Sequence, residues 1–277
     1  MLFTFRYYRR SDSLVVAGSP CSSTGRPATL LCWSRCARRH HGCQFVLAPC
    51  ATGTGRGPAV ATFTVAHLAV VVYSAGTVFD GLSIGRVDTE HFLRSGSLDR
   101  VASRADRALL EDLRDVAQFV IDHAGGTIDA AFVRAVNATI TRSGALHPGQ
   151  LRTQEQSIGV ATPYGRHTPD PVTEGELQAL LAVATRGGDM EENALDLFVS
   201  LARAQPFEDG NKRTAVFVAN SLLIGPDAGV LLTIPVDDND PSLAGAFHDL
   251  LARAYVYGEH DGVKDLLRRC GLTRLRQ

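Results

Sequence analysis

The sequence predicts a mainly α-helical protein with one short β-hairpin, and three observations support this fold class. From about residue 65 onward, apolar side chains recur at helical spacing in one segment after another. Residues 144–171 interrupt this pattern with Gly, Pro and Thr and include a candidate hairpin. The hydrophobic share of 45% and the net charge of −1 are typical of a soluble globular protein.

The first 60 residues differ in composition from the remainder, so residues 61–277 are expected to form the folded domain. This segment contains eight Arg and one acidic residue, Asp12, without helical or strand periodicity. We expect a disordered or non-native extension. Zinc, disulfide or nucleic-acid modules are the alternatives, although the cysteine spacing does not match CxxC pairs and disulfides require export. The cysteines of this segment are Cys21, Cys32, Cys36, Cys43 and Cys50.

Residues 57–79 carry no formally charged side chain and are long enough to cross a membrane. Polar residues such as His67 and Ser74 dilute the run, and Gly76 interrupts it. A buried helix of the domain is therefore favoured over a membrane span. We expect a cytoplasmic protein without a membrane contact, and the balanced charge gives no reason to expect a nucleic-acid partner.

Further helices are expected from apolar spacing and capping signals. They cover 106–123, a segment capped by Thr127, a segment opened by Thr173, 190–204, 211–223, 241–255 and about 262–269. Residues 156–165 are expected to form the exposed hairpin within a flap of about 151–171, and 229–235 a short strand or extended link. Ile158 in this hairpin either contacts a target peptide by strand addition or packs internally.

The segment 205–214, Gln-Pro-Phe-Glu-Asp-Gly-Asn-Lys-Arg-Thr, joins two apolar helices and contains the candidate site. Pro206 disfavours helical backbone at Gln205. Phe207 is the only large apolar side chain of the loop, so it is expected to anchor the loop in the core. Asp209 offers a hard oxygen ligand suited to Mg²⁺ shared with substrate phosphates.

The residues after Asp209 fit an anion. Gly210, Asn211 and Lys212 supply free N–H groups at a helix N-terminus, and Arg213 adds a guanidinium that matches phosphate oxygens. An ordinary capped turn with solvated Lys and Arg side chains is the alternative. The segment therefore predicts a nucleotide–magnesium site.

These ten residues resemble the signature of the Fic/Doc (Fido) family, His-Pro-Phe-x-Asp/Glu-Gly-Asn-Gly-Arg-x-x-Arg, and the likeness extends less specifically over about 70–271. The resemblance implies a Fic-type α-helical core with a β-hairpin flap over the active site. It implies transfer of part of ATP, usually AMP, to a hydroxyl of a target protein. It also implies roles: Asp209 as magnesium ligand, Gly210, Asn211 and Lys212 as the phosphate-binding turn, and Arg213 as the first phosphate-binding arginine.

Three residues depart from that signature. Gln205 stands where the family has its catalytic histidine, and a carboxamide cannot act as the general base, a contribution of about 10²- to 10⁴-fold. It can still orient a hydroxyl by hydrogen bonding. Lys212 replaces a glycine and resembles the Doc branch, which transfers phosphate. Val216 replaces the second arginine.

The resemblance also raises three questions of regulation and chemistry. Self-inhibited members pair a helix glutamate with the second arginine; here Asp80 lies at the corresponding place, but Val216 excludes the usual pair. His167 is a candidate substitute base, ahead of His147 and His248. We expect an adenylyltransferase of low activity, with Doc-like phosphotransfer or a catalytically muted nucleotide-binding module as alternatives. A bacterial toxin held by a separate antitoxin is left open.

Overall fold

In the computed structural model, the described residues are 8–10, 13–15 and 63–275, apart from 145, 157 and 225–228. Contacts divide the chain into two units, Met1–Gly55 and Arg56–Gln277. In the first unit, β1 (Tyr8–Arg10) pairs antiparallel with β2 (Ser13–Val15), a pairing that the sequence analysis does not predict. The cysteines of this segment, and the expectation that it is disordered or non-native, lie outside the described residues.

The second unit is mainly helical, as predicted. Its first half contains η1 (Val65–Leu68), α1 (Ala69–Asp80), α2 (Arg86–Ser95), α3 (Arg104–Asp122) and α4 (Ala130–Ala138). Its second half contains β3 (Val160–Thr162), β4 (Gly165–His167), α5 (Glu174–Ala184), α6 (Met190–Ala204), α7 (Asn211–Leu223), β5 (Val230–Leu232), α8 (Pro241–Tyr257), α9 (His260–Cys270) and β6 (Leu272–Arg274).

The run 57–79 contributes most of α1, whose side chains from Val71 to Gly76 are buried in the core. Among the described residues, no helix combines the length and the apolar character needed to cross a membrane. The structure therefore agrees with the prediction of a buried helix at this place.

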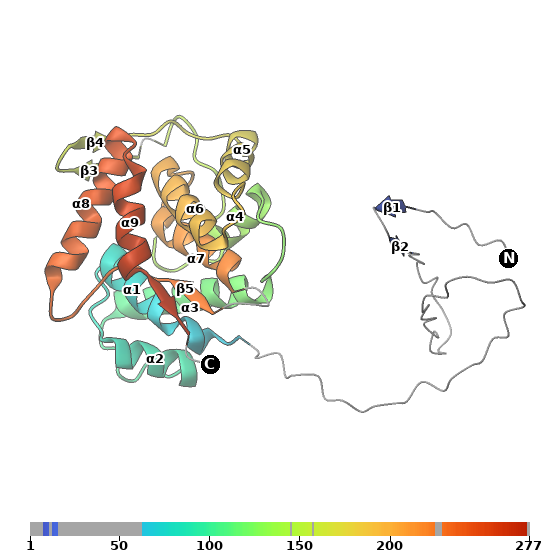
Figure 1. The fold of residues 1–277 in the computed structure, drawn as a ribbon. Helices are drawn as coiled ribbons and strands as arrows, with labels where there is room; N and C mark the ends of the chain where they lie inside the picture. The colour runs from blue at the N-terminus through green and yellow to red at the C-terminus, as the bar shows by residue number, and fades with distance from the viewer. Residues whose placement is uncertain are drawn as a thin grey trace, which may run out of the picture. The chain divides into compact units, whose positions relative to one another are not determined.

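Helices α6 and α7 form the centre of this unit, with α8 and α9 on one side and α4 and α5 on the other (Figure 1). Helix α7 is buried along almost its whole length, and Val216, Phe217 and Val218 are fully inaccessible. A helix whose buried residues lie on all sides is enclosed by the core. The loop between α6 and α7 is consequently fixed at both ends by the most buried helices of the unit.

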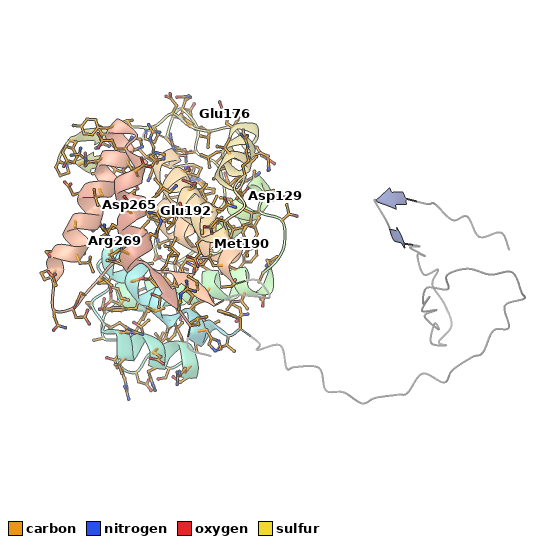
Figure 2. The ribbon with its side chains drawn as sticks, viewed as in Figure 1. Asp129, Glu176, Met190, Glu192, Asp265 and Arg269 are labelled. Atoms are coloured by element: carbon orange, nitrogen blue, oxygen red, sulfur yellow. The ribbon has the colours of Figure 1, made fainter. Side chains whose placement is uncertain are left out.

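Helix starts follow from local capping chemistry. The side chain of Asp129 accepts a hydrogen bond from Phe132 N at 2.8 Å and caps α4, so the expected cap at Thr127 was wrong by two residues. Thr173 and Glu176 form a reciprocal capping box at the start of α5, as predicted for Thr173. Figure 2 labels Asp129 at the start of α4 and Glu176 in the first turn of α5.

Strands β3 and β4 form the predicted hairpin, with Val160 opposite His167 and Thr162 opposite Gly165. The Tyr164 hydroxyl, in the turn, donates a hydrogen bond to Asp249 Oδ1 on α8 at 2.6 Å. This contact fixes the hairpin to α8. The predicted strand at 229–235 is β5, which pairs antiparallel with β6.

Candidate functional site

The loop between α6 and α7 has a fixed backbone. Gln205 ends α6 in the left-handed region at φ 48°, and it is the only non-glycine residue with positive φ in the described part of the chain. Phe207 follows with 1% exposure, buried among core residues as the sequence predicts. The Asn211 side chain brackets it, because Asn211 Oδ1 accepts from Phe207 N and Asn211 Nδ2 donates to Phe207 O, both at 2.8 Å.

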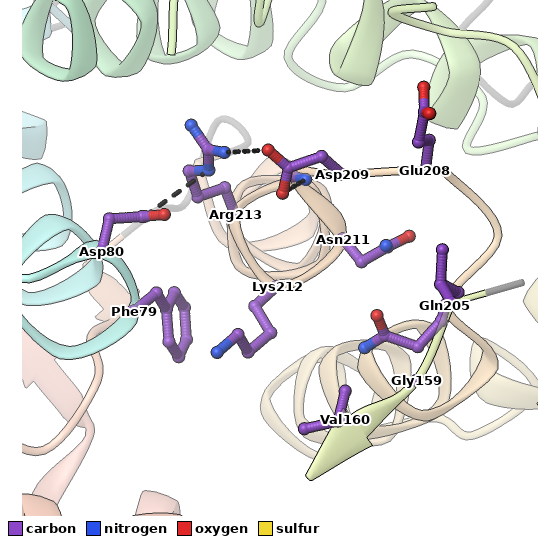
Figure 3. A pocket seen from close by; sticks show the side chains of 12 residues that line it. Phe79, Asp80, Gly159, Val160, Gln205, Glu208, Asp209, Asn211, Lys212 and Arg213 are labelled. Atoms are coloured by element: carbon purple, nitrogen blue, oxygen red, sulfur yellow. Dashed lines mark hydrogen bonds and ion pairs between the residues drawn. The ribbon is translucent and has the colours of Figure 1, made fainter. Parts of the chain in front are cut away.

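A pocket of about 160 Å³ opens above this loop, between the end of α1, the start of the hairpin and the N-terminus of α7. Figure 3 shows Asp80 and Asp209 on either side of the Arg213 guanidinium, and Lys212 extending toward Phe79. The pocket is lined by Phe79, Asp80, Ile158, Gly159, Val160, Gln205, Glu208, Asp209, Gly210, Asn211, Lys212 and Arg213. Apart from the buried Phe207, the site residues predicted in the segment 205–213, together with Ile158, therefore line one pocket.

The N-terminus of α7 presents backbone donors. Among the described residues, none accepts a hydrogen bond from the N–H of Asn211, Lys212 or Arg213. The Gly210 N–H donates instead to Asp209 Oδ1 at 2.6 Å, so two of the three expected donors, those of Asn211 and Lys212, remain available together with the N–H of Arg213. Gly210 has φ +72°, a backbone conformation that favours glycine, and a Cβ there would lie 2.8 Å from Ile140 Cδ1, so that side chain would have to shift.

The two cations of the site differ in their surroundings. The Arg213 guanidinium lies 3.3 Å from Asp209 Oδ2 and 3.5 Å from Asp80 Oδ2. Within the described part of the chain, Lys212 has no carboxylate within ion-pair distance, and its Nζ lies 5.0 Å from the centre of the Phe79 ring. Burial lowers the pKa of Lys212, which the nearby Asp80 carboxylate partly opposes.

Asp80 contacts the site, although the sequence analysis found no support for a role there. Val216, at the position of the family's second arginine, is uncharged and fully buried, so it offers Asp80 no ion-pair partner. Asp80 pairs instead with Arg213, the arginine one turn earlier. Burial raises the pKa of the Asp80 carboxyl group, while Arg213 and Lys212 act in the opposite direction.

No histidine lines the pocket in the described part of the chain. His167 Nε2 lies 2.8 Å from Arg203 O, and its ring stacks on Tyr255 with centroids 5.0 Å apart, so it is committed to fixing β4. His147 Nδ1 lies 3.2 Å from Glu208 Oε2 at the surface. At position 205 the amide Nε2 donates to Ala202 O at 2.6 Å, which leaves the amide oxygen and the second N–H of the amide for a ligand.

The sequence analysis missed two buried residues that fix the loop. Arg152, 4% exposed, donates from Nε to Gln205 O at 2.7 Å and from Nη2 to Pro169 O at 2.6 Å and Asp170 O at 2.8 Å. It therefore ties both ends of the flap segment to position 205. Burial lowers the pKa of Arg152, which the nearby Asp170 carboxylate partly opposes.

Asn137 on α4 is the second missed residue, with no exposed surface. Its Nδ2 donates to Asp209 O at 3.1 Å and to Thr214 Oγ1 at 3.0 Å, and its Oδ1 accepts from Gly149 N at 2.8 Å. The sequence did contain a signal for Asn137, because it is a polar residue at a position where the helical spacing of α4 expects an apolar one. A buried side-chain amide at such a position is usually hydrogen-bonded.

Comparison with known proteins agrees with this geometry. Residues 127–223 match the model of the Fic/DOC family. A search of curated proteins found no match. A Fic domain-containing signalling protein from Bacteroides thetaiotaomicron has a similar structure, with a TM-score of 0.57, 17% identity, and coverage of 73% of this chain and 81% of that one.

Part of Fic-1 from C. elegans gives the same TM-score of 0.57 at 16% identity, over 73% of this chain and 59% of the other. At such identities the likeness shows a shared fold. The family match covers the hairpin, the loop between α6 and α7, and nearly all of the pocket's polar lining. Residues 127–223 of this chain therefore match the Fic/DOC family model, and the fold is that of Fic-domain structures.

Proposed function

We propose that this protein binds ATP with Mg²⁺ and transfers AMP, slowly, to a hydroxyl side chain of a target protein. The observation that supports it is the meeting, in one pocket, of Asp209, Lys212, Arg213 and the unpaired N–H groups at the start of α7. Phosphates bind such helix termini because several donors and the helix dipole point at one place. The positive charges of the Lys212 and Arg213 side chains add to the attraction of the helix N-terminus for phosphate.

Asp209 fits a magnesium ligand. Its side chain is 48% exposed, and each oxygen accepts one hydrogen bond, from Gly210 N and from Arg213 Nη2, which leaves lone pairs for a metal. Bound Mg²⁺ would neutralise phosphate charge. Lys212 and Arg213 would then contact the remaining phosphate oxygens.

The transfer step explains the low rate that we expect. The acceptor oxygen attacks the α-phosphorus, pyrophosphate leaves, and the hydroxyl proton must pass to a base. The amide of Gln205 orients the hydroxyl but cannot accept that proton, so the rate falls by about 10²- to 10⁴-fold. Among the described residues, the histidines that could substitute do not line the pocket.

Two further functions are favoured by particular residues. Lys212 in place of a second glycine favours transfer of the γ-phosphate, as the resemblance to the Doc branch implies. Gln205 and Val216 together favour a nucleotide-binding module without chemistry. A target protein and an antitoxin belong to the proposal as partners of unknown identity.

The test is incubation with ATP labelled at either the α- or the γ-phosphate. We expect α-label on protein, weakly in the wild type and strongly in Gln205→His, with Gln205→Ala as the matched control. Asp209→Ala is expected to abolish it. If only the γ-phosphate label appears on protein, the activity is phosphotransfer. If Gln205→His binds ATP–Mg²⁺ in calorimetry but transfers no label, the transferase proposal is refuted and the nucleotide-binding module is favoured.

A further inference from the structure

Arg213 is an unusual phosphate-binding candidate because its side chain is only 2% exposed and is contacted from three directions. Two of these contacts are carboxylates, Asp80 and Asp209. The third is neutral: Arg213 Nη1 donates to Ser143 Oγ at 2.6 Å, the shortest of the three. Ser143 belongs to the loop after α4 and lies outside the predicted motif.

Ser143 is itself held by a buried carboxylate. Its Oγ donates to Asp112 Oδ2 at 2.7 Å, and Asp112, on α3, has no exposed surface. Asp112 also accepts from the backbone N–H of Thr141, Arg142 and Ser143, at 3.1, 3.0 and 2.7 Å. The Arg142 guanidinium lies 3.1 Å from Asp112 Oδ1 and compensates its charge.

These hydrogen bonds form a series from Asp112 through the Ser143 hydroxyl to the Arg213 guanidinium. A hydroxyl that donates to a carboxylate becomes a stronger acceptor, because neighbouring hydrogen bonds polarise one another. Asp112 fixes both the hydroxyl proton and the backbone on either side of it. The Ser143 oxygen is thus directed at Arg213 by four hydrogen bonds that Arg213 does not itself make.

The chemistry of this contact differs from that of the two carboxylates. Asp80 and Asp209 orient Arg213 but cancel its charge, and a metal ion at Asp209 would compete for the same oxygens. Ser143 orients the guanidinium without cancelling its charge. It occupies one of the five N–H groups of Arg213, so donors on Nη1 and Nη2 remain for a phosphate.

We propose that Ser143, held by Asp112, is a positioning residue that keeps Arg213 oriented and charged for contact with a nucleotide phosphate. This inference rests on the proposed nucleotide binding and assigns a function to a loop outside the motif. Without the Ser143 hydroxyl, Arg213 turns to the carboxylates and is less available to phosphate.

The experiment compares Ser143→Ala with Ser143→Thr, which keeps a hydroxyl. Calorimetry measures the affinity for ATP–Mg²⁺ at a temperature where circular dichroism shows every variant folded. We expect Ser143→Ala to bind ATP–Mg²⁺ about 5- to 30-fold more weakly, because one hydrogen bond to a charged group is lost. Ser143→Thr is expected to restore most of the affinity.

Ser221→Ala is the matched control, because that buried serine donates only within α7, to Val218 O at 2.6 Å. It should change Tm without changing the affinity for ATP–Mg²⁺. Equal or tighter binding by Ser143→Ala, or no rescue by threonine, overturns the inference while the proposed function stands. If the wild type binds no ATP–Mg²⁺, both fall together.

Discussion

Replacing Asn137 by alanine is expected to lower the free energy of unfolding by about 3 kcal/mol. The buried amide makes three hydrogen bonds, to Asp209 O, Thr214 Oγ1 and Gly149 N. Each contributes about 1 kcal/mol, and the partners left behind are buried with it. Domains of this kind are stable by about 5 to 15 kcal/mol, so the variant should still fold. Urea unfolding followed by circular dichroism measures the change.

Asn220 provides the control. It is equally buried on α7 and also makes three hydrogen bonds, to Val216 O, Leu232 O and Leu232 N, away from the pocket. Asn220→Ala should cost a similar free energy and leave ATP–Mg²⁺ affinity unchanged. Asn137→Ala should weaken that affinity as well, because Asn137 fixes the backbone of Asp209. A loss below about 1 kcal/mol for Asn137→Ala would refute the hydrogen-bond reasoning.

Three more predictions follow from the same contacts. Lys212 and Lys264 are the only lysines; burial lowers the pKa of Lys212, whereas burial of Lys264 is outweighed by two α6 carboxylates that raise its pKa. NMR of ¹³C-labelled lysine should show Lys212 losing its proton at the lower pH, and the reverse order would contradict this. Tyr164→Phe removes the hydrogen bond to α8 and should speed amide exchange in the hairpin several-fold; unchanged exchange would show that other contacts fix it. Asp80→Asn should raise ATP–Mg²⁺ affinity about 5-fold, since the ion pair competing for Arg213 is worth about 1 kcal/mol; weaker binding would show that Asp80 supports the site.

The sequence predicted best those elements whose ends carry local signals. Helices α6 and α7 begin and end at the expected residues, because Pro206 and Gly210 separate two strongly apolar runs. Helix α2 was missed, since only Thr89, Phe92 and Leu93 of it are buried and its other residues carry no apolar period. Strand β6 was missed because a three-residue strand is defined by its distant partner, β5.

The residues of the candidate site likewise divide into those that a local sequence signal predicts and those that it does not. The residues from 205 to 213 are contiguous and are positioned by local backbone geometry, so their motif predicted where they meet. Asp80, Asn137 and Ser143 contact these residues only through the packing of α1 and α4 against α7, which no local pattern encodes. Asn137 and Asp112 each occupy the apolar side of a predicted helix, and that mismatch was the signal for a buried polar contact.

The hydrogen bonds of Arg152 determine which changes of sequence the flap segment can tolerate. Because Arg152 binds the Gln205 carbonyl together with the carbonyls of Pro169 and Asp170, the two ends of the flap segment are fixed independently of the hairpin between them. Hairpins of other lengths and sequences can therefore be grafted between residues 153 and 168 without moving position 205. Such a segment can vary the pocket wall formed by Ile158, Gly159 and Val160 while position 205 stays in place.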